Sequence, residues 1–173
     1  MADPAKEGES NRPKLTIRAA RISDLDRLFQ IEQNCFFSDR LSRRSLGRQI
    51  RNDRPSVLVA EIDDEIAGYA MILFSIRTSI ARLYSIAVDP AYRGISVGRR
   101  LMAEAERAAA GQGARKMRLE VRRDNEQARA LYGTAGYQAL CELPHYYADG
   151  CSGLRYEKDL SDVMALNETA EAG

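Results

Sequence analysis

Two periods in the pattern of apolar and polar residues separate the expected strands of this chain from its expected helices. Runs rich in β-branched residues that alternate with a period of two indicate strands, and apolar residues that recur every three or four positions indicate helices. We expect strands at Leu15–Ala19, Ser56–Glu61, Ile66–Phe74, Ala81–Val88, Met117–Val121, Gln138–Leu143 and Leu154–Lys158. We expect helices at Ser23–Asn34, Ser42–Asn52, Val97–Ala110 and Asn125–Ala135. This order of elements predicts a single α/β domain, in which helices pack on a mixed sheet.

The two ends of the chain lack these patterns. Residues 1–13 are polar and charged, which predicts a disordered leader. Residues 161–173 are acidic and show no strong pattern, so we expect a flexible C-terminal tail there. The folded domain is then expected at residues 14–160. A chain of 173 residues that is 45% apolar has the size of one domain with one core.

The charge composition argues against a general nucleic-acid-binding surface. The chain has 26 basic and 25 acidic residues, with a net charge of +1, whereas proteins that bind nucleic acid through their overall charge are strongly basic. The N-terminal segment MADPAKEGESNRPK has no apolar core of the length that a signal peptide needs, and no apolar run in the chain approaches a membrane span. We therefore expect a cytoplasmic protein without a nucleic-acid or membrane partner, as a monomer or a weak homodimer.

The three cysteines, Cys35, Cys141 and Cys151, are widely separated. Their number is odd and their spacing is not that of metal ligands, so we expect reduced thiols and no metal site. The alternative is a catalytic pair of Cys141 with His145, the only histidine, but no Asn or Asp that would orient the pair is recognisable beside them.

The segment Tyr84–Gly98, read as YSIAVDPAYRGISVG, is the most informative motif of the chain. A β-branched strand ends at an Asp-Pro pair, and a glycine-bearing turn with Arg93 then opens a helix, where Arg99 and Arg100 follow. The N–H groups of such a turn, the helix dipole and the arginines together attract phosphate. The spacing fits neither G-x-x-x-x-G-K-[ST] nor G-x-G-x-x-G. The alternative is an ordinary strand-to-helix turn that happens to carry Arg and Gly.

Several motifs in order extend this segment into a family resemblance. The turn reads R-G-I-S-V-G, which matches R-x-x-G-x-G except that Ser96 replaces the first of the two motif glycines. The sequence MRLEVRRDNEQARALYGTAGY follows at Met117–Tyr137. Together with IAVDP at Ile86–Pro90, these motifs resemble the GNAT superfamily of acetyl-CoA-dependent N-acetyltransferases, and within it the RimI-type ribosomal-protein-alanine branch. The resemblance covers residues 15 to about 160. It implies a GNAT-like fold, with a mostly antiparallel central sheet, helices on both faces and a splayed strand pair that holds acetyl-CoA.

The resemblance assigns acetyl-CoA to two runs of backbone. It places the pyrophosphate on the turn residues Arg93, Gly94, Ile95, Ser96, Val97, Gly98 and Arg99. It places the pantetheine arm on the backbone groups of Ile86, Ala87 and Val88, with the Val88 N–H polarising the thioester carbonyl. By their side chains alone, these three residues are a plain buried strand. Ser96 departs from the motif by adding a Cβ close to phosphate, at a cost of roughly 1 kcal/mol, while its hydroxyl offers a hydrogen bond.

Two residues are candidates for proton transfer. The period of two in Met117–Arg122 places Glu120 on a polar face, which is equally typical of a solvated face with ion pairs. Attack on a thioester needs a free amine lone pair, so a proton acceptor is required, and the resemblance places that role on Glu120. Tyr132 is either an aromatic packed on the sheet or, as the resemblance implies, the acid that protonates the leaving thiolate.

Asn125 has two interpretations that are compatible with each other. It is a helix N-cap, or it is a hydrogen-bond partner of the pantetheine arm, as the resemblance implies. Asp124 with Gln127 forms the pattern of a competing capping box, which would free Asn125 for a ligand.

The acceptor is less constrained than the cofactor. The resemblance suggests the α-amine of a protein N-terminus, such as that of a ribosomal protein. The alternatives are a small free amine, a lysine side chain, or a non-catalytic acetyl-CoA-binding sensor. For the turn His145–Tyr147 two interpretations stay open: it closes over the end of a peptide, or its aromatic side chains pack on the surface. The second helix carries arginines that form a solvated face, a nucleic-acid patch or a reader of an acidic substrate: Arg43, Arg44, Arg48, Arg51 and Arg54.

Overall fold

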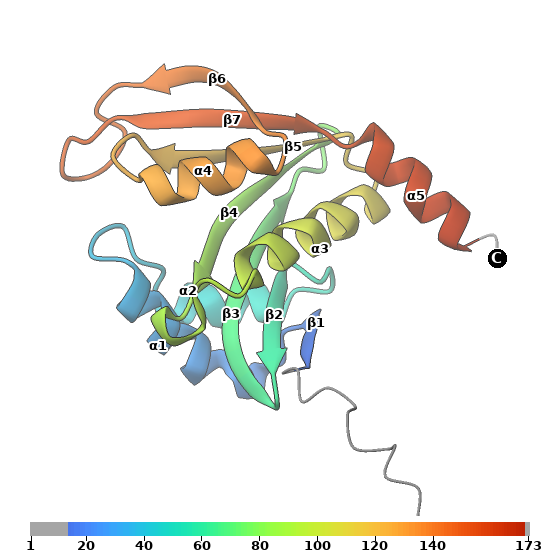
Figure 1. Cartoon of the computed structure of the whole chain (residues 1–173), viewed down its shortest axis with the longest axis horizontal. Helices are drawn as coiled ribbons and strands as arrows, with labels where there is room; N and C mark the ends of the chain where they lie inside the picture. The colour runs from blue at the N-terminus through green and yellow to red at the C-terminus, as the bar shows by residue number, and fades with distance from the viewer. Residues whose placement is uncertain (1–13, 172–173) are drawn as a thin grey trace, which may run out of the picture.

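The computed structural model describes residues 14–171, and these form one sheet with helices on both faces (Figure 1). The strands are β1 (Leu15–Ala19), β2 (Val57–Ile62), β3 (Glu65–Phe74), β4 (Ile80–Val88), β5 (Lys116–Arg122), β6 (Gln138–Leu143) and β7 (Gly153–Asp159). The helices are α1 (Leu25–Cys35), α2 (Arg43–Ile50), α3 (Val97–Gly111), α4 (Glu126–Thr134) and α5 (Ser161–Glu171), and short 3-10 turns lie at Ile22–Asp24 and Pro90–Tyr92. Every strand and helix expected from the sequence is confirmed, with small shifts at the ends.

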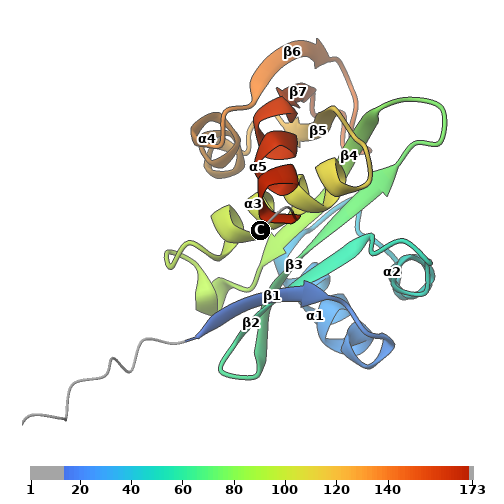
Figure 2. The ribbon, with the colours of Figure 1, turned by 90° about the vertical axis from the view of Figure 1, so that its right-hand side faces the viewer.

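The C-terminal segment corrects one expectation. Residues 161–173 were expected to be a flexible tail, but Ser161–Glu171 forms α5, which lies beside α3 (Figure 2). Leu160 is fully buried just before the helix, and Val163 packs on the main core. The amide of Asn167 donates to the Arg107 carbonyl at 3.3 Å. The expected leader, residues 1–13, lies outside the described residues.

The strand order places a divergent pair at the centre of the sheet. The order is β1-β2-β3-β4-β5-β7-β6, and every neighbouring pair is antiparallel except β4 with β5. These two parallel strands pair only where Ile80–Arg82 meet Lys116–Arg118. Beyond that point β4 continues to pair with β3 alone, and the two strands run apart (Figure 1). The splayed strand pair and the mostly antiparallel sheet are therefore confirmed.

Helices pack through their apolar faces on both sides of the sheet. On one face, α3 buries Leu101, Met102 and Ala105 against β2, β3 and β4. On the other face lie α1 and α2 (Figure 2). They bury Leu28 and Leu46 in a cluster with Tyr69. Full burial of one such leucine stabilises the fold by about 1.5–3 kcal/mol. Among residues 14–171, no helix combines the length and apolarity that crossing a membrane requires.

Candidate active site

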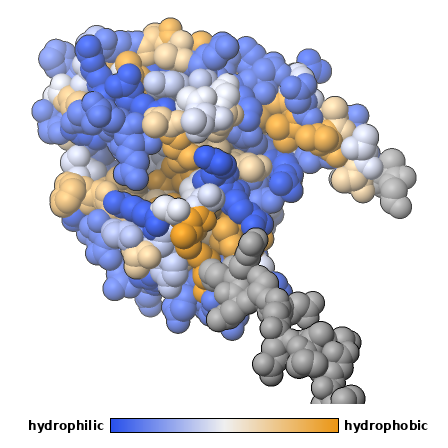
Figure 3. Space-filling view, viewed as in Figure 1, coloured by the Kyte–Doolittle hydropathy of each residue, from blue (hydrophilic) through white to orange (hydrophobic). Residues whose placement is uncertain are grey.

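A cleft of about 720 Å³ opens where β4 and β5 diverge. Its walls come from both strands, the turn before α3, the start of α4, and the loops that follow α1 and β6. Figure 3 shows apolar residues at the floor of a hollow on this face. The fold brings these predicted site residues together around the cleft: Ile86, Ala87, Val88, Arg93, Gly94, Ser96, Val97, Gly98, Arg99, Glu120, Asn125 and Tyr132. Ile95 does not line the cleft and is half exposed.

Two residues of the turn before α3 have a positive φ. Gly94 has φ +83°, and Ser96 has φ +66°, in the left-handed region that favours glycine. This conformation costs a non-glycine residue about 1–2 kcal/mol, which explains why a glycine suits the place of Ser96. Gly98 is different, because its φ lies outside that region and a Cβ there would meet only Leu131 Cδ2 at 3.5 Å and Val88 Cγ2 at 3.6 Å. Packing within the fold therefore does not require a glycine at position 98.

Side chains of the protein fix the end of β4 next to this turn. The Val88 carbonyl accepts hydrogen bonds from Cys35 Sγ and Arg93 Nε, both at 3.3 Å. Asp89 accepts from the Ala91 N–H at 2.9 Å and from Arg27 Nη2 at 2.8 Å. The strand end and the turn are thus held as one unit. The predicted role of the Val88 N–H toward a thioester stays a prediction.

Glu120 on β5 combines the two interpretations made from the sequence. Its carboxylate pairs with Arg82 Nε of β4 at 2.8 Å and with Arg155 Nη2 of β7 at 3.1 Å. The Glu120 side chain is nevertheless only 7% exposed and lines the cleft. The two guanidinium groups compensate its charge and fix its direction. Their contribution could not be read from the sequence, because the pairs join strands 38 and 35 residues apart.

Tyr132 of α4 is both a packed aromatic and a cleft residue. Its ring is tilted against those of Tyr137 and Tyr156, with centroids 6.1 and 6.3 Å away. Burial, and to a smaller extent the neighbouring Tyr147, raises the pKa of Tyr132 above its ordinary value. The phenol therefore keeps its proton near neutral pH, as a proton donor must.

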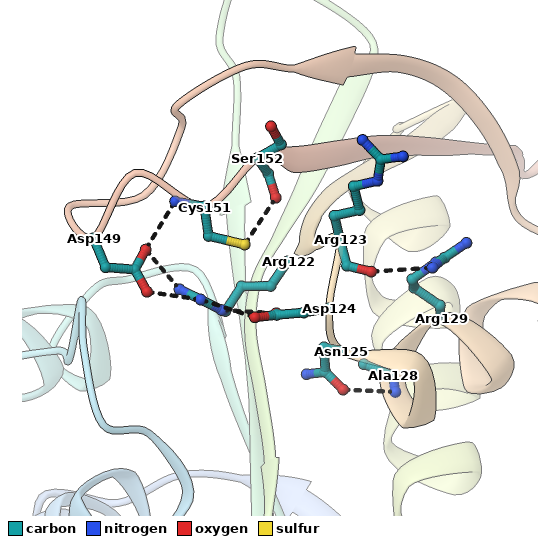
Figure 4. A network of polar contacts seen from close by, with 9 residues as sticks. All are labelled: Arg122, Arg123, Asp124, Asn125, Ala128, Arg129, Asp149, Cys151 and Ser152. Atoms are coloured by element: carbon teal, nitrogen blue, oxygen red, sulfur yellow. Dashed lines mark hydrogen bonds and ion pairs between the residues drawn. The ribbon is translucent and has the colours of Figure 1, made fainter.

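The structure settles how α4 begins. Asn125 Oδ1 accepts from the Ala128 N–H at 3.0 Å, so the N-cap interpretation is confirmed (Figure 4). The capping box of Asp124 with Gln127 was wrong, because both carboxylate oxygens of Asp124 accept from Arg122. Asn125 also lines the cleft. Its side-chain NH₂ group is the part that could serve a ligand.

Two tyrosines of the loop between β6 and β7 complete the wall near Glu120. Tyr146 and Tyr147 line the cleft, and their rings meet edge to face at 5.1 Å. The Tyr146 hydroxyl accepts from Arg82 Nη2 at 2.9 Å, and burial raises the pKa of Tyr147 to about 12. His145 does not line the cleft.

A buried polar group on the α1 side was not anticipated from the sequence. Glu32 is 2% exposed and accepts hydrogen bonds from the Tyr69 hydroxyl and from the Leu41 N–H. The Tyr69 hydroxyl also lies 3.2 Å from Ser85 Oγ. Burial raises the pKa of Glu32. In the sequence Glu32 resembles any polar residue of an amphipathic helix, so nothing marked it as buried.

Two alternatives from the sequence find no place at the cleft. The five arginines of the second helix and the segment after it are exposed and lie outside the cleft lining, and Arg43 pairs with Asp26 at 2.7 Å. Their position argues against contact with a substrate bound in the cleft and leaves their role otherwise a prediction. Cys141 is exposed on β6 and is also absent from the cleft lining, which argues against a catalytic pair with His145.

Comparisons with known proteins agree with this geometry. Residues 25–137 match the Acetyltransferase (GNAT) family. An uncharacterized protein of Mycobacterium leprae is 36% identical over 146 residues, which are 83% of this chain but 40% of that protein. The N-alpha-acetyltransferase RimI of Mycobacterium tuberculosis is 31% identical over 152 residues, 86% of this chain and 94% of that protein. The crystal structure of the ribosomal-protein-S18-alanine N-acetyltransferase from Escherichia coli superposes with a TM-score of 0.76 and 25% identity, and covers 86% of this chain and 95% of that one. The family match spans more than half of the chain, which therefore belongs to the GNAT acetyltransferase family.

Proposed function

We propose that this protein transfers the acetyl group of acetyl-CoA to the α-amine of a protein N-terminus. The observation that carries the proposal is that a single cleft joins the phosphate-attracting turn before α3 with Glu120 and Tyr132. The relatives support the acceptor class, since one is named an N-alpha-acetyltransferase and another acts on an alanine of a ribosomal protein.

The residues of the turn fit the pyrophosphate of acetyl-CoA. The N–H groups of residues 94–99 lie where the turn opens α3, and Arg93 and Arg99 stand at its two ends. A helix start of this kind binds anions through free N–H groups and the helix dipole. Gly98 supports the fit. The fold has room for a Cβ at this position, so a glycine here is explained by the close approach of a ligand rather than by packing. The backbone of Ile86, Ala87 and Val88 faces the gap left by β5 and is offered to the pantetheine arm.

Glu120 and Tyr132 divide the proton transfers. Acetyl-CoA supplies the acetyl group as a thioester. Glu120 takes a proton from the acceptor ammonium, directly or through a water, so that the nitrogen lone pair can form the new N–C bond. Tyr132 gives its proton to sulfur as the C–S bond breaks. The protein forms no covalent intermediate, because neither residue acts as a nucleophile and Cys141 lies away from the cleft. The Cys35 thiol does line the cleft, but it donates to the Val88 carbonyl, and burial raises its pKa, which disfavours the nucleophilic thiolate.

An N-terminal α-amine suits the pair of Glu120 with the loop tyrosines. Its ordinary pKa is about 7.7–8.0, against about 10.4 for lysine, so freeing its lone pair at neutral pH is easier by roughly 3 kcal/mol. Tyr146 and Tyr147 stand at the wall next to Glu120 and offer aromatic faces and hydroxyl groups to a peptide end.

Matched peptides test the acceptor class. One peptide has a free N-terminal alanine and an internal lysine, a second is the same peptide with a blocked N-terminus, and a polyamine stands for small amines. After incubation with acetyl-CoA, fragment mass spectra locate the acetyl group. We expect acetylation of the first peptide at its α-amine alone. Acetylation only of lysine or only of the polyamine would contradict the proposal, and binding of acetyl-CoA without transfer to any of the three would indicate a sensor.

A further inference from the structure

The loop between β6 and β7, residues 144–152, has little burial of its own to hold it in place. Apart from Tyr147, residues 144–150 are exposed. Hydrogen bonds within the loop close it into a turn, with the Gly150 N–H donating to the Tyr147 carbonyl at 2.9 Å and the Tyr147 N–H to the Cys151 carbonyl at 3.1 Å. Gly150 has φ +81°, which suits this turn. Outside the loop, the Arg123 N–H donates to the Ser152 carbonyl at 2.9 Å and ties the end of the loop to β5. The rest of the loop is a compact unit that side-chain contacts hold against its neighbours.

Arg122, the last residue of β5, supplies the most extensive of these contacts. Its Nη1 and Nη2 donate to the two carboxylate oxygens of Asp149 at 3.1 and 2.7 Å (Figure 4). The Asp149 carboxylate is oriented by the Cys151 N–H, which donates to its Oδ1 at 3.0 Å. On its other side, Arg122 pairs with Asp124 at 3.0 Å. The Arg122 guanidinium also lies 5.1 Å from the centre of the Tyr147 ring, within the range of a cation–π contact.

We propose that Arg122 is a positioning residue that holds the loop 144–152 over the acceptor end of the cleft, through Asp149 and Tyr147. This inference rests on the proposed function for what the loop binds. Arg122 follows Glu120 by two residues on the same face of β5, so the clamp fixes the loop tyrosines relative to the proton acceptor. Arg82 makes a second link of the same kind, because it pairs with Glu120 and donates to the Tyr146 hydroxyl.

The geometry favours a clamp over an ordinary surface ion pair. Arg122 is 26% exposed and Asp149 is 47% exposed, and the fork of one guanidinium engages two carboxylates at once. Bidentate pairs of this kind fix orientation as well as supplying energy. Isolated surface pairs, by contrast, often contribute almost nothing. The adjacent pair of Arg123 with Glu142, 63% and 42% exposed and outside the cleft, is such a case.

The test compares Arg122→Met, Asp149→Asn and their double variant with the control Arg123→Met. Hydrogen–deuterium exchange reports the loop directly, and we expect faster exchange of residues 144–152 in the first three proteins and wild-type exchange in the control. Steady-state kinetics of Arg122→Met with the free-alanine peptide should show a KM raised roughly tenfold, because an ion pair and a cation–π contact are lost together. Asp149→Asn removes the ion pair alone, so its KM should rise less. The KM of the double variant should equal that of Arg122→Met, since that single variant has already lost the ion pair. Arg122→Lys should not restore the wild-type KM, because lysine lacks the fork.

Exchange and kinetics separate this inference from the proposed function. Exchange needs no acceptor, so faster loop exchange in a protein that acetylates no N-terminal peptide would support the clamp and refute the function. Wild-type exchange and KM in Arg122→Met would overturn the clamp. A fall in kcat with unchanged KM and exchange would also overturn it, because Arg122 would then act on the chemical step. If Arg122→Met does not fold, Asp149→Asn at its exposed site tests the same clamp through faster loop exchange and a smaller rise in KM.

Discussion

Replacing Gly98 with alanine separates what the fold needs from what the ligand needs. Gly98 lies in the first turn of α3, and its added Cβ would sit at ordinary van der Waals distances, 3.5 and 3.6 Å, from two side chains. Alanine is favoured over glycine inside a helix by about 0.5–1 kcal/mol. We expect Gly98→Ala to stabilise the protein by roughly 0.5 kcal/mol, the lower end because the residue is near a helix start. For a chain of this size that corresponds to a rise in Tm of about 1–2 °C.

The same methyl group should weaken acetyl-CoA binding. If the pyrophosphate lies against the start of α3, the Cβ holds it away from at least one N–H group. A hydrogen bond to a charged group contributes about 1.5–3 kcal/mol, so we expect Kd to rise roughly 10- to 100-fold. Stability and affinity should thus change in opposite directions in one variant.

Calorimetric titration with acetyl-CoA and a thermal melt of the same samples measure both quantities. Gly133→Ala is the matched control, because Gly133 is likewise a glycine within a helix but lies outside the cleft lining. At position 133 the new Cβ would have no atom within 4 Å. The control should gain stability and keep its Kd. A wild-type Kd in Gly98→Ala would refute the placement of the pyrophosphate. A fall in Tm would refute the packing argument.

Four further substitutions test the site. Ser96→Gly relieves a left-handed residue whose side chain makes no cap hydrogen bond, so acetyl-CoA affinity by calorimetry should be equal or modestly better; a large loss would mean that the hydroxyl binds the ligand. Glu120→Gln should lower kcat and remove the acidic limb of the pH–rate profile, while Tyr132→Phe should lower kcat with acetyl-CoA affinity nearly unchanged; full activity of both variants would contradict their roles. Cys141→Ala should keep wild-type activity, since Cys141 is exposed on β6 outside the cleft lining; trapping an acetylated Cys141 would contradict direct transfer.

Periodicity was sufficient to predict the strands and the helices that pack on them. The alternation in Met117–Val121 predicted β5, and the apolar stripe of Val97, Leu101 and Ala105 predicted α3. Both are local signals, and both elements lie where they were expected. The tail from Ser161 misled the prediction because its few apolar residues form no continuous stripe. Its helix is stabilised by packing beside α3, which a local pattern does not record.

The chemistry of the site was only partly readable from the sequence. The motifs named the residues that meet in the cleft, but not the partners that orient them. Arg82 and Arg155 reach Glu120 through strand pairing, and Asp149 reaches Arg122 across 27 residues. The left-handed backbone of Ser96 was also hidden, because a serine in a turn gives no sign of its φ. Register and backbone conformation, which follow from the whole fold, decide these features.

A crystal structure with a bisubstrate analogue, in which coenzyme A is joined through an acetyl bridge to the α-amine of an alanine-starting peptide, tests the central claim most directly. We predict the pyrophosphate on the N–H groups of residues 94–99, the pantetheine arm along Ile86–Val88, and the α-nitrogen within reach of Glu120, with Tyr132 near the sulfur. The peptide should leave the cleft beside Tyr146 and Tyr147. A pyrophosphate bound away from the start of α3, or an α-nitrogen remote from Glu120, would contradict the account.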